Sequence, residues 1–265
     1  NNSTSFALNI AGMNTDAFSA FAPDDSKANN TQNIDKDHYR NRSISSNLSH
    51  QFNEKVKIDL QYFLSTGRNM YDSRYANYDN SYVDYKNKSK VETYSAKITG
   101  KINDKWESSI NIGKSTDLFS GQQKYNNATF QWVSGEIDMY ETSQYQLSWQ
   151  NNVDLEYGSL VLLYDFLKEE IDTTQPYDKT KRTNNGFVVG YNIQLENHTI
   201  QTSLREDINS QYDNETTGSI GYAYQINPEW RISSSYGTAF VAPSFNYLYW
   251  ASGTHALGNP NLKPE

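Results

Sequence analysis

The chain contains 265 residues and has a formal net charge of −8; 36% of its residues are hydrophobic and 14% are aromatic. The acidic balance disfavours nucleic acid as a partner, and the lack of cysteine excludes disulfides and thiolate metal sites. A mean hydropathy of −0.83 is typical of polar or disordered proteins. However, 21 Tyr and 5 Trp argue against disorder, because large rings are usually buried or held at an interface.

The first clear predicted strand begins at Val56, and apolar and polar residues alternate from there through Tyr62. Successive side chains of a strand point to opposite faces, so this segment has one apolar and one polar face. The same alternation recurs near residues 94–102, 106–112, 145–149, 160–166, 187–195 and 220–224. The longest apolar run, from Leu160 to Tyr164, is far shorter than the ~20 residues of a membrane-spanning helix. Any membrane crossing is therefore expected to use strands.

The predicted connections between strands are of two kinds, short and long, which alternate along the chain. Short turns are expected near residues 53–54, 103–105, 156–158, 196–197 and 227–229. Longer polar connections are expected near residues 12–37, 67–89, 119–133, 171–184 and 207–215. This alternation is typical of outer-membrane barrels, which have tight turns on one rim and long loops on the other. A soluble β-sandwich would share the strands but has no reason to sort its loops in this way.

Together these patterns predict an all-β fold, an antiparallel transmembrane β-barrel, of which this chain supplies about eleven strands. Each strand is long enough for the ~9–11 residues that a tilted membrane strand needs. An odd, open set of strands would leave backbone groups unsatisfied in hydrocarbon. The chain is therefore expected to be part of a larger barrel.

Residues 230–245 read WRISSSYGTAFVAPSF and residues 258–265 read GNPNLKPE. This pair of segments closely resembles the barrel of TonB-dependent outer-membrane receptors. The resemblance implies a 22-stranded barrel closed by an N-terminal plug, with residues 1–265 forming the middle part of the barrel domain and the plug and C-terminal strands lying outside this chain. It also implies an importer without enzymatic activity in the outer membrane of a Gram-negative bacterium, surrounded by lipid and lipopolysaccharide and energised by TonB through the plug.

Acidic residues gather in the first two long connections, where Asp37, Asp72 and Asp84 are examples. Calcium takes six to eight oxygen ligands, so converging aspartates would suit it. Within the family, residues 35–39 and 68–72 together with Asp84 resemble the cobalamin receptors, whose calcium ions order the loops that meet the ligand. The resemblance implies calcium as a structural cofactor, with these candidate ligands: Asp35, Asp37, Tyr71, Asp72, Asp84 and, more loosely, Asp16. His38 departs from the pattern by replacing a small residue, and the alternative is that these aspartates are ordinary turn residues.

Aromatic residues are also dense in the long connections. Rings on loops can cover a flat, partly apolar ligand while presenting a polar edge, which predicts a substrate-binding role for Tyr75, Tyr78, Tyr82, Tyr249 and Trp250. The alternative is an aromatic girdle at the outer rim that does not touch the ligand.

The function that these features predict is import of a scarce ligand, with cobalamin as the first candidate. A ferric-siderophore or haem receptor of the same family is the alternative, although an anionic ferric chelate would favour Arg and Lys over Asp. A barrel hydrolase is the alternative from a different class. The four histidines, His38, His50, His198 and His255, lie in no recognisable catalytic motif.

Overall fold

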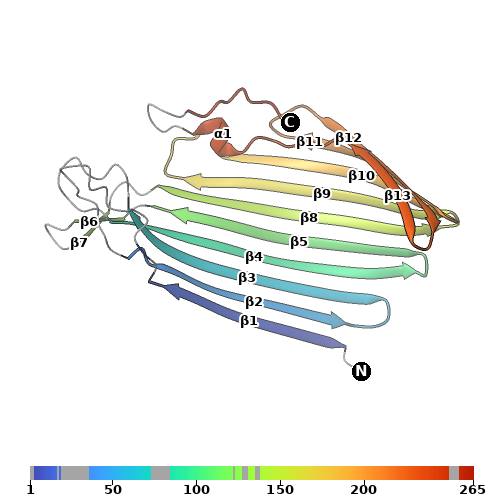
Figure 1. Ribbon diagram of the computed structural model, residues 1–265, viewed down its shortest axis with the longest axis horizontal. Helices are drawn as coiled ribbons and strands as arrows, with labels where there is room; N and C mark the ends of the chain where they lie inside the picture. The colour runs from blue at the N-terminus through green and yellow to red at the C-terminus, as the bar shows by residue number, and fades with distance from the viewer. Residues whose placement is uncertain are drawn as a thin grey trace.

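The computed structural model describes residues 3–16, 18, 36–72, 84–121, 123–126, 131–134, 138–250 and 257–265. Eleven strands of this part form one antiparallel sheet, in which each strand pairs with the next in chain order (Figure 1). They are β1 (Thr4–Thr15), β2 (Tyr39–Gln51), β3 (Val56–Asp72), β4 (Asp84–Asn103), β5 (Trp106–Ser120), β8 (Met139–Leu155), β9 (Gly158–Thr173), β10 (Lys181–Leu195), β11 (His198–Asn209), β12 (Glu215–Asn227) and β13 (Trp230–Gly237).

Two smaller elements lie outside this sheet. Strands β6 (Gln123–Asn126) and β7 (Gln131–Ser134) form a separate hairpin, and α1 (Phe245–Tyr249) is a short helix. Within the described ranges, no helix is both long and apolar enough to cross a membrane.

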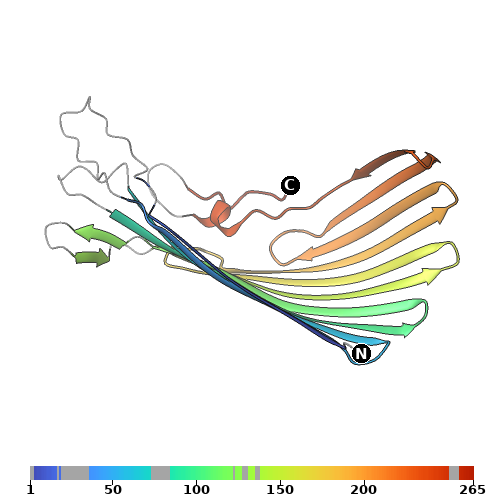
Figure 2. The ribbon, with the colours of Figure 1, turned by 60° about the horizontal axis from the view of Figure 1, so that its bottom comes forward.

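The sheet curves into an open trough, and α1 with the C-terminal segment lies over its concave side (Figure 2). An incomplete cylinder of eleven antiparallel strands confirms the predicted fold class. The only buried apolar side chains of the described residues are Ile171, Ala223, Phe245 and Leu248, so the sheet does not enclose a conventional hydrophobic core.

The two faces of the trough have opposite chemistry. Register places Ile98 opposite Ile110, and Ile110 opposite Trp149, forming an apolar row whose members are 44–48% exposed. The opposite face carries rows such as Asp59–Lys97–Asn111–Ser148. The polar face is the concave one, because Arg182 on this face contacts the segment that lies over it. The apolar residues therefore form a belt on the convex face.

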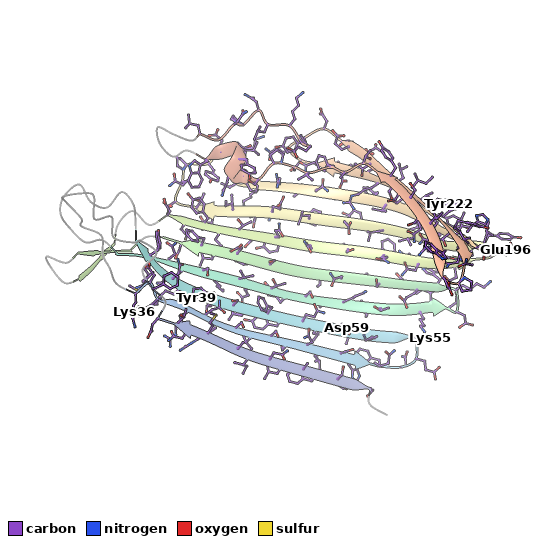
Figure 3. The ribbon with its side chains drawn as sticks, viewed as in Figure 1. Lys36, Tyr39, Lys55, Asp59, Glu196 and Tyr222 are labelled. Atoms are coloured by element: carbon purple, nitrogen blue, oxygen red, sulfur yellow. The ribbon has the colours of Figure 1, made fainter. Side chains whose placement is uncertain are left out.

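The edge of the sheet formed by residues 52–55, 104–105, 156–157, 196–197 and 228–229 is named the turn rim; Lys55 and Glu196 mark it in Figure 3. Asparagine builds three of these turns. Asn53 Oδ1 accepts hydrogen bonds from the backbone N–H groups of Lys55 and Val56, at 2.9 and 3.0 Å, and Asn103 and Asn227 act in the same way. Such side-chain bonds mimic a backbone turn, which explains why Asn recurs here. The five predicted short turns are confirmed.

The opposite edge, where the longer connections leave the sheet, is named the loop rim, and Lys36 and Tyr39 lie there (Figure 3). The strands reach further toward it than predicted: β1 runs to Thr15, β3 runs to Asp72 and β4 begins at Asp84. The predicted connections at 12–37, 67–89, 171–184 and 207–215 were therefore too long, and β6 and most of β7 lie within the predicted loop at 119–133. Alternation marks a strand only where its two faces differ, and both faces are polar near this rim.

The last strand, β13, ends at Gly237, within the segment 230–245 that resembles the receptor family. Thr238 N–H still donates to Gly218 C=O, at 2.9 Å, but Val241 then exchanges backbone hydrogen bonds with Glu265, at 2.9 and 3.1 Å. After it leaves the sheet, the chain thus pairs with the C-terminal segment.

Candidate functional site

The predicted metal ligands that the structure describes all lie at the loop rim. Asp16 follows β1, Asp37 precedes β2, Tyr71 and Asp72 end β3, and Asp84 begins β4. Register makes Asp72 and Asp84 direct backbone partners across the β3–β4 pair. Asp35 and the side chains of Asp72 and Asp84 lie outside the described residues.

Two contacts bring the ends of β1, β2 and β3 together. His38 Nδ1 lies 3.4 Å from Asp16 Oδ1, and Met70 N–H donates to His38 C=O at 2.9 Å. His38, the departure from the family pattern, thus contacts a candidate ligand. In the described part of the chain, no three His, Asp or Glu side chains are grouped as a metal site.

Two of the predicted substrate-binding residues, Tyr249 and Trp250, belong to an aromatic cluster on the concave side of the loop rim. Trp250 stacks on Tyr140, with ring centroids 5.5 Å apart, and Tyr249 lies 6.3 Å from Tyr177. Gln211 Nε2 donates to the Tyr249 hydroxyl at 3.0 Å, and the Tyr177 hydroxyl donates to Asn246 Oδ1 at 2.9 Å. Tyr75, Tyr78 and Tyr82 lie outside the described residues.

Arg182 holds the C-terminal segment against the sheet. Its side chain is only 8% exposed; it pairs with Glu169, donates to Pro243 C=O at 2.6 Å and lies 5.0 Å from the Phe245 ring centre. The helix α1 begins directly after this contact, where Ser244 Oγ accepts a hydrogen bond from Tyr247 N–H at 3.2 Å. The aromatic cluster is therefore positioned by an arginine on β10.

Burial raises the pKa of tyrosines in and beside this cluster. It raises the pKa of Tyr177 to about 12, with a smaller contribution from Tyr140, and it also raises the pKa of Tyr249 and Tyr212. The folded-state pKa of Tyr177 exceeds the ordinary value of 10.0. Its contribution to stability is therefore complete below pH 10 and is lost as the pH rises to about 12.

Tyr177→Phe should remove the latest phenolate signal when the complete receptor is titrated with base and followed by near-ultraviolet absorbance. Tyr247→Phe is the control, because Tyr247 lies in the neighbouring helix but is 71% exposed. A late signal that persists in Tyr177→Phe would contradict the burial of this hydroxyl.

A second charged group lies on the concave face between β9 and β11. Arg205 makes a bidentate pair with Asp207, at 2.7 and 2.8 Å, and reaches Asp165 at 2.9 Å. Gly186 leaves room for this bridge, because a Cβ there would lie 2.1 Å from Arg205 Nη2. Asp207 is only 3% exposed.

Sequence reasoning did not identify Arg182 or Arg205. The alternation of apolar and polar residues does place both arginines on the polar face of the sheet, and this pattern was the sequence signal available for them. Their carboxylate partners Glu169 and Asp165 lie on a neighbouring or next-but-one strand, so the pairing depends on strand register.

The family model described as TonB dependent receptor-like, beta-barrel matches residues 1–265. The chain is 27% identical over 233 residues to the vitamin B12 transporter BtuB of Photobacterium profundum and 27% identical over 239 residues to that of Vibrio vulnificus, covering 87% and 86% of this chain. It spans 35% of the length of each of these relatives.

Solved structures agree at the level of fold. The ferric enterobactin receptor of Pseudomonas aeruginosa superposes with a TM-score of 0.72 and 14% identity, over 94% of this chain and 40% of that one. The siderophore receptor PirA of the same organism superposes with a TM-score of 0.66 and 17% identity, over 86% of this chain and 41% of that one. Proteins of this family lie in the outer membrane of Gram-negative bacteria, with long loops extracellular and short turns periplasmic. The family match over residues 1–265, together with the curved sheet and its short turns on one rim and long connections on the other, shows that this chain belongs to the TonB-dependent receptor β-barrel family.

Proposed function

We propose that the complete receptor imports cobalamin across the outer membrane, with energy supplied by TonB acting on the plug. The observation that carries this proposal is the similarity to two vitamin B12 transporters over more than four-fifths of the chain. The solved siderophore receptors support only the fold, since they are at most 17% identical. The barrel itself performs no bond chemistry in this proposal.

The charges on the concave face near the aromatic cluster favour a ligand without strong negative charge. Arg182 of β10 and Arg205 of β11 lie on this face, and both are paired with carboxylates. A ferric chelate that carries negative charge would need cations that are not already neutralised. Tyr249 and Trp250 offer rings suited to a large, partly apolar ligand instead.

We further propose that calcium orders the loop-rim connections before the ligand binds, using Asp35, Asp37, Tyr71, Asp72 and Asp84, with Asp16 at the edge of the set. The opposed positions of Asp72 and Asp84 in the β3–β4 register support this assignment. Oxygen ligands from neighbouring connections suit calcium. Ordering these segments in advance would reduce the entropy lost on capture.

The test measures cyanocobalamin binding to the complete receptor with calcium and with a chelator. We expect calcium to lower Kd about tenfold, which corresponds to ordering only one or two residues in advance. Asp72→Asn combined with Asp84→Asn should remove most of this effect. The matched control is Asp104→Asn combined with Asp154→Asn, which makes the same chemical change at the turn rim and should behave like the wild type.

Three outcomes are informative. Binding of cyanocobalamin that is equally tight without calcium would contradict the calcium site and leave the transport proposal intact. Preferential binding of a ferric siderophore, or of haem, would contradict cobalamin as the ligand. A loss of the calcium effect in the turn-rim control as well would show that the metal acts elsewhere.

A further inference from the structure

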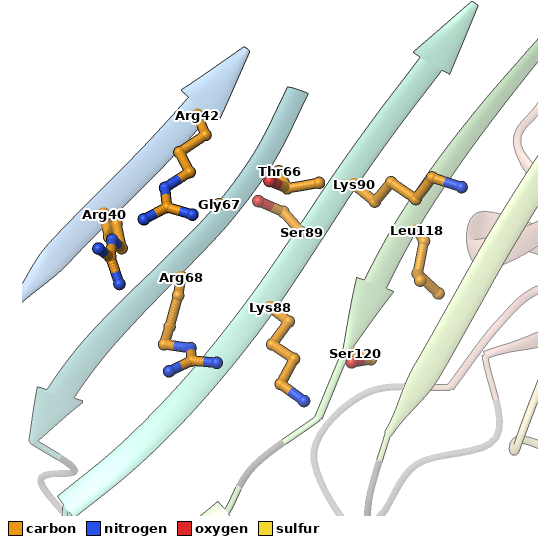
Figure 4. A pocket seen from close by; sticks show the side chains of 10 residues that line it. All are labelled: Arg40, Arg42, Thr66, Gly67, Arg68, Lys88, Ser89, Lys90, Leu118 and Ser120. Atoms are coloured by element: carbon orange, nitrogen blue, oxygen red, sulfur yellow. The ribbon is translucent and has the colours of Figure 1, made fainter. Parts of the chain in front are cut away.

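The convex face carries a cluster of cations where β2, β3 and β4 approach the loop rim. We name Arg40, Arg42, Arg68, Lys88 and Lys90 the basic patch (Figure 4). Register arranges its members in two rows across the strands. Arg40 lies opposite Arg68 and Arg68 lies opposite Lys88, whereas Thr66 separates Arg42 from Lys90 in the second row.

The position of the basic patch corresponds to the lipid headgroup level. Along β3, the apolar belt residue Leu60 is followed on the same face by Tyr62, Leu64, Thr66 and Arg68. Along β4, the same order leads from Ala96 through Tyr94 to Lys90 and Lys88. A change from aliphatic to aromatic to charged side chains marks the boundary between hydrocarbon and headgroups in outer-membrane barrels.

Four of the five cations have no carboxylate partner in the part of the chain that the structure describes. Lys90 pairs with Glu92 at 2.6 Å, but Arg40, Arg42, Arg68 and Lys88 are exposed and make no such ion pair. Like charges directly opposite one another across strands are destabilising. The row Arg40–Arg68–Lys88 therefore costs the sheet stability unless an anion lies on it.

On the convex face of β9 and β10, by contrast, the cations are neutralised within the protein. Lys168 and Lys181 both pair with Glu170, at 2.8 and 3.2 Å. A cluster of cations without carboxylate partners is thus a feature of β2–β4 and not of β9 and β10. Between them, Lys114 of β5 lies over the Tyr145 ring, 4.9 Å from its centre.

Two grooves meet at the basic patch. The first, of about 350 Å³, lies among the cations, where Thr66 and Ser120 have short side chains between longer ones. The second, of about 390 Å³, runs toward the apolar belt and is lined by Ile10, Ile44 and Leu64. Arg42 and Thr66 line both grooves, so a charged groove continues into an apolar one.

We propose that this surface binds a phosphorylated glycolipid of the outer leaflet, with its phosphates on the basic patch and an acyl chain in the apolar groove. Guanidinium groups match phosphate oxygens in a bidentate geometry, which suits the three arginines. The continuity of the two grooves favours a lipid over free phosphate, because free phosphate would use only the charged groove. The lipid A part of lipopolysaccharide has this chemistry.

The test uses the complete receptor in detergent, freed of lipid, and measures binding by native mass spectrometry. The probes are lipid A with two phosphates, the same lipid after removal of both phosphates, and inorganic phosphate. Arg68→Gln combined with Lys88→Gln removes two charges from the basic patch. Lys168→Gln combined with Lys181→Gln removes two charges from the neutralised sector and is the matched control.

We expect the patch variant to bind phosphorylated lipid A about tenfold more weakly than the wild type, and the control variant to bind it normally. Without lipid, the patch variant should unfold at the same or a higher temperature, because like-charge repulsion is relieved. Arg68→Lys, which keeps the charge, should retain most of the binding.

Equal binding by the patch and control variants would overturn the proposal, as would equal binding of dephosphorylated lipid A. Inorganic phosphate that competes as strongly as the lipid would show a simple anion site and overturn the lipid assignment. Cyanocobalamin or siderophore binding by the patch variant reports independently that the barrel is folded, so the outcome does not depend on which ligand the receptor imports.

Discussion

Leu147→Arg is expected to lower the stability of the barrel in a phospholipid bilayer by about 2–4 kcal/mol, the cost of arginine at the middle of the lipid-facing surface. Leu147 lies midway along β8 on the convex face, opposite Ile112 and Phe166, and is 36% exposed. The measurement is the urea midpoint for unfolding of the complete receptor in vesicles.

Gln146→Arg is the matched control, since Gln146 precedes Leu147 and lies on the concave face of the same strand. There an added arginine faces the polar interior and should change the midpoint little. Equal effects of the two substitutions would mean that the two faces of the sheet have been assigned to the wrong environments. The pair therefore tests the membrane assignment with one chemical change on two adjacent residues.

Arg205→Met should destabilise the barrel by about 3–5 kcal/mol, the usual cost of removing one partner from a buried charge pair. The substitution leaves Asp207, which is 3% exposed, without its bidentate cation, and leaves Asp165 without its long-range partner. The loss can be followed by the urea midpoint of the complete receptor.

Two variants separate this effect from loss of a long side chain. Arg231→Met removes an exposed concave arginine near the turn rim and should change stability by less than about 0.5 kcal/mol. Adding Asp165→Asn and Asp207→Asn to Arg205→Met should restore much of the loss, because no buried charge then lacks a partner. Failure of the triple variant to recover would indicate that the arginine acts mainly through packing.

The sequence predicted the strands well wherever they cross the apolar belt. There one face is apolar and the other polar, so residues such as Ile110 and Asn111 reveal the strand by alternation. Beyond the belt this contrast disappears, and the extension of β3 through Arg68 to Asp72 was missed for that reason. The terminal motif identified the family, yet it did not show that α1 lies over the concave face.

The candidate site was predicted less completely, because its contacts join residues that are distant in the chain. Trp250 was chosen as an aromatic loop residue, but its stacking on Tyr140 depends on how the C-terminal segment crosses the sheet. The residues next to Arg182 in the sequence gave no indication that its side chain contacts Pro243. The basic patch shows the same limit, since Arg40 and Lys88 become neighbours of Arg68 only through strand register.

The unequal rims also bear on how the sheet assembles. Four residues separate β2 from β3 across the turn rim, whereas 23 residues separate β1 from β2 across the loop rim. Closing the longer connection costs about 1.5 kcal/mol more chain entropy. Pairs joined at the turn rim are therefore the natural modules of assembly, and a barrel of this kind can gain or lose strands two at a time while each rim keeps its side of the membrane.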